Sequence, residues 1–223
     1  MSNETKPNVG ATMTIIHKAI SRGLDESSKQ SLAFLQCRYP DEAARDGFAT
    51  YVGSLHKVIN SHHLGEEALA FPYLKIILPQ APFDELLSEH HEMEVVLDEL
   101  QTMIGSLSSP GQGSISLDRL SRVISRLSDF WHPHIEKEEF HLYDPKKTEQ
   151  LMSVDEHIEL NMKLAQHAAQ LGDMEFKVPF ILYNLTPEDR DIFARGLPPV
   201  MVQELVPIVW QPKWSPMKRF MLE

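Results

Sequence analysis

The chain has 223 residues, 42% of them hydrophobic, which is enough to build the core of one domain without disulfide bonds. Its formal net charge of −11, with acidic and basic residues interspersed, excludes the basic surface of a nucleic-acid-binding protein. The single Cys37, the lack of a signal-sequence pattern and the absence of a run of about 20 apolar residues lead us to expect a cytosolic protein that does not enter a membrane.

The first third of the chain predicts two long helices. Apolar residues recur at helical spacing from Ala11 to about Cys37, and Pro40 follows this run. Asp41 is a suitable N-cap for a second helix that extends to about Ile77. The seam of this helix advances by alternating steps of four and three residues, as in a helical bundle: Leu55, Ile59, His62, Glu66, Leu69 and Tyr73. Pro72 lacks an N–H and predicts a bend just past the His/Glu pair.

The middle of the chain predicts a second pair of helices. The third runs from about Phe83 to Leu107, and residues 108–114 form a linker rich in serine, glycine and proline. Pro133 predicts a bend in the fourth helix, beside the second His/Glu pair. The seam of the fourth helix changes from aliphatic to polar halfway along: Leu120, Ile124, Leu127, Trp131, His134, Glu138 and His141.

The C-terminal part predicts a fifth helix from about Lys147 to Leu171, ending at Gly172. Seven of the fifteen prolines lie in residues 179–223, where Thr186-Pro187 is a helix start and Gly196 a helix stop. We expect one all-α domain over residues 1–223. In it, residues 11–145 form an antiparallel up-down-up-down four-helix bundle, and residues 146–223 add the fifth helix and a proline-rich extension of short helices packed on the bundle.

Candidate ligands for a metal fall into a sequence repeat. Each copy has the pattern His-x3-Glu-x4-aromatic, and a lone histidine precedes each pattern by 44 or 45 residues. The first copy comprises His17, His62, Glu66 and Phe71, and the second comprises His90, His134, Glu138 and Tyr143. In an antiparallel bundle, seam residues at one depth converge on the axis, so four histidines and two glutamates should meet there.

This combination of side chains indicates cations. A glutamate buried in a bundle core without a partner would cost several kcal/mol and would take up a proton instead. Imidazole and carboxylate ligands suit iron, manganese or zinc, and the seams contain no cysteine for a thiolate site. Two bridging glutamates and four histidines fill eight of twelve octahedral positions on two metals. A bridging oxygen would fill two more, which leaves about two positions for a small molecule.

Each residue alone has a simpler interpretation. A single helical histidine is usually a surface or cap residue, and His-x3-Glu is a common i,i+4 pair. The duplication of the whole pattern favours the metal site. Three aromatic residues and a methionine near it are core residues that could also form a dry wall: Phe71, Trp131, Tyr143 and Met93. His141 is either a group behind the ligands or a pocket-lining residue. Four further histidines should flank the site or face solvent: His63, with Glu67, flanks it, and His91, His132 and His167 are solvated.

The repeat resembles the hemerythrin-like, or HHE cation-binding, family. The resemblance covers about residues 11–145 and rests on His17…His62-x3-Glu66…His90…His134-x3-Glu138. It implies a non-haem centre of two iron ions, bridged by two carboxylates and an oxo or hydroxo oxygen, that binds dioxygen. Hemerythrins have a fifth histidine one turn from His90, where this chain has Leu86 and Glu94. The resemblance therefore implies a vacant position or a carboxylate from Glu94. The segment from Val178 looks like an extension found in fungal members of the family.

Several functions fit such a centre. The leading hypothesis is a di-iron protein that binds dioxygen or a related small oxidant. The alternatives are a di-iron oxygenase or oxidase that acts on an organic substrate, and an iron or oxygen sensor. A purely structural bundle is the fourth possibility. An oxidative enzyme should have a cavity at the centre larger than dioxygen requires, and a sensor should lose stability when its metal is removed.

Overall fold

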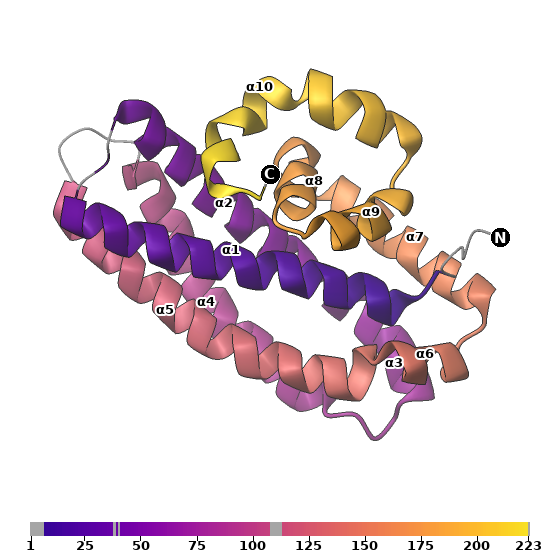
Figure 1. The fold of residues 1–223 in the computed structure, drawn as a ribbon. Helices are drawn as coiled ribbons and strands as arrows, with labels where there is room; N and C mark the ends of the chain where they lie inside the picture. The colour runs from indigo at the N-terminus through magenta and orange to yellow at the C-terminus, as the bar shows by residue number, and fades with distance from the viewer. Residues whose placement is uncertain (1–6, 38, 40, 108–112, 223) are drawn as a thin grey trace.

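Four long helices form the body of the molecule in the computed structural model, which describes residues 7–37, 39, 41–107 and 113–222. They are α1 (Val9–Cys37), α2 (Glu42–Gly65), α4 (Phe83–Leu107) and α5 (Gly113–Glu138). Each packs against the next, and α5 closes the ring against α1 (Figure 1). The described residues contain no strand. The expected all-α four-helix bundle is therefore confirmed.

A short π-helical segment begins at the glutamate of the first His/Glu pair and directly after the glutamate of the second. The segment η1 (Glu66–Ala70) separates α2 from α3 (Phe71–Ile77), and η2 (Glu139–Tyr143) follows α5. In η1, the N–H of Phe71 bonds to the carbonyl of Glu66, five residues earlier. Pro72 cannot donate a hydrogen bond, and it lies directly after this wider turn, in the first turn of α3. Pro133 lies inside α5, and the π-helical segment begins after Glu138 rather than at the proline.

The expected fifth helix is instead two helices. They are α6 (Pro145–Leu151) and α7 (Val154–Gln170), separated by Met152 and Ser153. Ser153 begins α7 with a capping box in which its hydroxyl accepts the backbone N–H of Glu156 and the Glu156 carboxylate accepts the N–H of Ser153. The sequence Ser-Val-Asp-Glu contains this signal, because a serine followed three residues later by a glutamate is the pattern of a capping box.

Short helices cover α1 and α2 on one side of the bundle (Figure 1). In chain order they are α8 (Met174–Tyr183), α9 (Pro187–Arg195), η3 (Met201–Val209), α10 (Gln211–Trp214) and η4 (Ser215–Phe220). As expected, Thr186 caps α9 and Gly196 ends it. Arg22 of α1 ties this region down, because its guanidinium donates to the carbonyl of Phe220 at 3.0 Å and also to the side chain of Asn184.

The ligand candidates lie in a polar layer between two hydrophobic clusters. On α1, Met13 belongs to one cluster and Ile20 to the other, and His17 lies between them. On α4, Leu86 and Met93 flank His90 in the same way. The bundle therefore encloses polar side chains at one level, with a packed apolar core above and below. Within the residues described, no helix is long and apolar enough to cross a membrane.

Candidate metal centre

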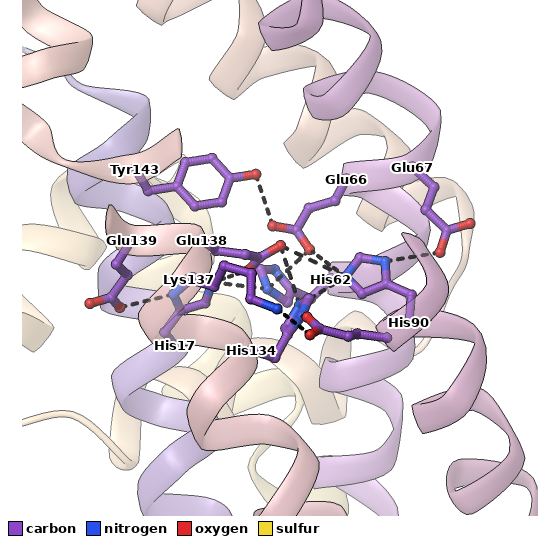
Figure 2. A network of polar contacts seen from close by, with 11 residues as sticks. His17, His62, Glu66, Glu67, His90, His134, Lys137, Glu138, Glu139 and Tyr143 are labelled. Carbon is purple, nitrogen blue, oxygen red and sulfur yellow. Dashed lines mark hydrogen bonds and ion pairs between the residues drawn. The ribbon is translucent and has the colours of Figure 1, made fainter. Parts of the chain in front are cut away.

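Two pairs of imidazoles face each other inside the bundle. The Nε2 atoms of His17 and His62 are 3.1 Å apart, and those of His90 and His134 are also 3.1 Å apart. The first pair comes from α1 and α2, and the second comes from α4 and α5. Figure 2 shows the four rings converging on one region. The arrangement offers two places where two imidazole nitrogens can bind one cation.

The two glutamates lie between these imidazole pairs. Glu66 Oε2 is 3.3 Å from His62 Nε2 and 3.6 Å from His90 Nε2. Glu138 Oε2 is 3.4 Å from His17 Nε2, and its Oε1 is 3.3 Å from His134 Nε2. Each carboxylate thus reaches both imidazole pairs (Figure 2). This is the position of a group that bridges two cations.

The carboxylate oxygens of Glu66 and Glu138 are better suited to bind metal ions than to accept hydrogen bonds. Both glutamates are 0% exposed. Neither oxygen of Glu138, nor Oε2 of Glu66, has a hydrogen-bond partner among the described residues. Leaving such groups unpaired in a protein interior is costly. Two ligands about 2.1 Å from one cation and at right angles lie about 3 Å apart, close to the separations observed here. The residues present therefore fit two cations.

Burial and mutual contact give four of the acidic and basic groups unlike pKa values in the metal-free site. Burial, with the charge of Glu138 added, raises the pKa of Glu66 well above its ordinary value. Burial would also raise the pKa of Glu138, but the imidazoles of His134, His90 and His17 hold it well below its usual range. Burial lowers the pKa of His62 well below 6.5, whereas Glu138 and Glu89 outweigh burial and raise the pKa of His134. A cation would compete with protons for these groups.

Three further carboxylates hold the imidazoles from behind. His17 Nδ1 lies 2.9 Å from Glu139 Oε1, and His90 Nδ1 lies 2.9 Å from Glu67 Oε1. The third contact joins His134 Nδ1 to Glu89 Oε2 at 2.8 Å, and Lys137 pairs with Glu89. A carboxylate at Nδ1 places the proton there and leaves Nε2 free for a metal. The sequence pattern predicts Glu67 only as a flanking residue and does not include Glu89 or Glu139.

Aromatic rings surround the imidazoles. The Trp131 ring lies edge-on to His17, with centroids 5.7 Å apart, and Phe71 stacks on His90 at 5.3 Å. Tyr143 has a further role, because its hydroxyl donates to Glu66 Oε1 at 2.8 Å. The phenol is fully buried and comes from the second repeat, while Glu66 comes from the first. No spacing in the sequence indicates this contact between the two copies.

The other candidates have different environments. Glu94 is exposed and is not part of the buried His/Glu cluster, so the structure gives no support to it as a fifth ligand. His141 lines a crevice of about 340 Å³ with residues 77–81 and Lys147, and it is not among the clustered ligand candidates. His91 and His132 are exposed as expected, and His167 is half-buried rather than solvated. His63 is buried beside the site instead of only flanking it.

The fold and this cluster define a helical-bundle protein with a buried His/Glu site suited to metal ions. A comparison with family models matches residues 11–144 to the hemerythrin HHE cation binding domain. Because the match covers more than half of the chain, the protein belongs to this family. No curated protein and no solved structure matched the chain.

Proposed function

We propose that the protein binds two iron ions, bridged by Glu66, Glu138 and an oxo or hydroxo oxygen, and that it binds dioxygen or a related small oxidant there. The observation that carries this proposal is the pair of buried glutamates between two facing imidazole pairs. When bound, two ferrous ions can together supply two electrons to an oxidant. The histidine and glutamate ligands suit iron, manganese and zinc alike. We choose iron because the chain also matches the hemerythrin family.

The surrounding residues prepare the site for such a ligand. Glu139, Glu67 and Glu89 fix three imidazoles with Nε2 directed inward. Tyr143 holds one oxygen of Glu66, which leaves the other oxygen between the two imidazole pairs. Trp131 and Phe71 pack against the imidazoles and keep bulk water away from them.

Burial supports a small oxidant over an organic substrate. The six side chains proposed as ligands are between 0% and 7% exposed. The crevice beside His141 is lined by none of them. An oxygenase or oxidase with an organic substrate would need an approach to the metals wider than these contacts provide.

Anaerobic reconstitution tests the proposal. The metal-free protein is titrated with Fe²⁺ under argon, and the bound iron is measured before the sample is exposed to air. We expect about two iron ions per chain, together with a new charge-transfer absorption band after exposure. Two bound iron ions with no spectral change on exposure would contradict oxidant binding, and no bound iron would contradict the metal site itself.

A further inference from the structure

A fifth imidazole lies at the site beside the four already described. The His63 ring stacks on His90 with centroids 4.0 Å apart and planes 20° from parallel, and its centroid is 5.9 Å from that of His134. Its side chain comes from α2, directly after His62. One ring nitrogen each from His63, His90 and His134 lie within 4.8 Å of one another. His63 therefore faces the second imidazole pair, although it belongs to the first repeat.

One ring nitrogen of His63 has no hydrogen-bond partner in the part of the chain that the structure describes. Its Nε2 is buried and makes no hydrogen bond to any described residue, and the whole residue is only 6% exposed. By contrast, the Nε2 of each ligand histidine faces another imidazole or a glutamate. A buried imidazole nitrogen that gives up its water without a replacement contact destabilises the protein. A nearby cation would supply the missing contact.

The second repeat offers no counterpart to His63. A step of 72 residues takes His62 to His134 and Glu66 to Glu138, and the same step takes His63 to Ile135. Ile135 packs against the larger hydrophobic cluster. The extra imidazole is thus specific to one side of the centre, where His90 and His134 lie.

We propose that His63 is a third imidazole ligand for the cation held by His90 and His134. The inference rests on the proposed metal centre and makes its two cations unequal. The cation at His17 and His62 then has fewer protein ligands than the cation at His90 and His134. Two imidazoles on one cation cannot remain parallel and stacked, so the His63 ring must turn out of its stack on His90 when metal binds.

Replacing His63 with an aromatic residue that has no ring nitrogen tests the proposal. His63→Phe keeps an aromatic side chain that can stack on His90 but has no donor atom. The matched control is His91→Phe, because His91 follows His90 as His63 follows His62 but is exposed. Anaerobic Fe²⁺ titration of the whole chain should show one of the two sites weakened at least about tenfold in His63→Phe and neither weakened in His91→Phe. Circular dichroism without metal checks that each variant folds.

X-ray absorption of the iron-loaded protein gives a readout that does not depend on affinity. The average number of imidazoles per iron should correspond to five shared by two ions in the unaltered chain and to four in His63→Phe. Two bound ions and an equal imidazole number in both proteins would overturn the role of His63 and leave the metal centre intact. Failure of the unaltered chain to bind iron would instead overturn the proposed function.

Double variants show which cation His63 serves. In a His17→Ala background the remaining strong site should be the one at His90 and His134, and adding His63→Phe should weaken it further. In a His134→Ala background the same addition should change little, because the remaining site lies on the other side. Equal effects in both backgrounds would contradict the assignment to one cation.

Discussion

Each half of the centre is completed by residues from the other half. Tyr143 of the second repeat bonds to Glu66 of the first and lies against His17, while Phe71 of the first repeat stacks on His90 of the second. The carboxylates behind the imidazoles are exchanged in the same way, with Glu139 at His17 and Glu67 at His90. Each half of the cluster is therefore positioned by contacts from the other half, which only the complete bundle brings together.

Three positions break the equivalence of the halves. The repeat pairs Tyr143 with Phe71, so only one aromatic ring carries a hydroxyl. It also pairs His63 with Ile135, and Glu89 with Ile16. A third imidazole and an extra carboxylate therefore lie on the His90/His134 side, whereas the phenol approaches the His17/His62 side. A duplicated pattern can thus build two similar imidazole pairs, and a few unmatched residues can make their surroundings different.

The largest expected effect comes from removing the glutamate that contacts most imidazoles. Glu138 lies within 3.4 Å of His17 and His134, and 3.7 Å from His90. Glu138→Ala should therefore lower the bound iron from about two ions per chain to fewer than one, as measured by elemental analysis of the reconstituted protein. His132→Ala, an exposed histidine on the same helix, should retain both ions. Full iron content in Glu138→Ala would show that this carboxylate does not join the two halves.

Removing the metal from the unaltered chain should have the next largest effect. Each site that is filled at a metal concentration of about 100 times its dissociation constant adds roughly 2.7 kcal/mol of stability. Two such sites would raise the melting temperature by about 10–20 °C for a chain of this size. Thermal melts followed by circular dichroism, with iron and after chelation, measure the difference. An unchanged melt would also eliminate the iron-sensor hypothesis, which requires the fold to respond to metal loss.

Much of this arrangement could be predicted from local patterns. The alternating steps of four and three place His62 and Glu66 on one helix face, and Asp41 and Thr186 are caps because their side chains suit that position. The same patterns carry no information on contacts between distant segments. The Tyr143–Glu66 hydrogen bond spans 77 residues, and the Glu139–His17 contact spans 122.

His63 shows a second limit of seam reasoning. Adjacent helical residues point about 100° apart, so a seam of fixed width admits only one of His62 and His63. In the structure both are buried, because α4 and α5 enclose the second ring while α1 faces the first.

The break between α6 and α7 is a different case, because the capping signal at Ser153 is present in the sequence.

Removing the phenol hydroxyl would make the halves more alike. Tyr143→Phe deletes the hydrogen bond to Glu66 Oε1 and leaves two phenylalanines at the matched positions. We expect iron affinity to fall about tenfold, as for other groups that orient a metal ligand, and the charge-transfer band to shift. The control is Tyr73→Phe, because Tyr73 is a half-buried residue of α3. It should change neither the iron affinity nor the absorption band. If Tyr143→Phe matches the unaltered protein in both measurements, the hydroxyl has no part in the difference between the halves.

The smallest expected effect concerns Glu89, which has no carboxylate counterpart at Ile16. Glu138 and Glu89 raise the pKa of His134 against the effect of burial, whereas burial and the His17 imidazole lower that of His62. In the metal-free protein, NMR titration should therefore find His134 still protonated at a pH where His62 is neutral. Glu89→Gln should lower the pKa of His134 and reduce the difference between the pKa values of His134 and His62.

The sign of the stability change follows from the same shift. A histidine whose pKa is raised by folding stabilises the fold below its unfolded pKa of about 6.5, and this contribution is lost as the pH rises through the folded value. Glu89→Gln should therefore lose more stability in mildly acidic than in alkaline solution, measured by urea unfolding without metal at a series of pH values. Glu89 also pairs with Lys137, but neither group titrates between pH 6 and 9, so that loss is constant across the series. An equal loss at every pH would mean that Glu89 acts only through Lys137 and does not distinguish His134 from His62.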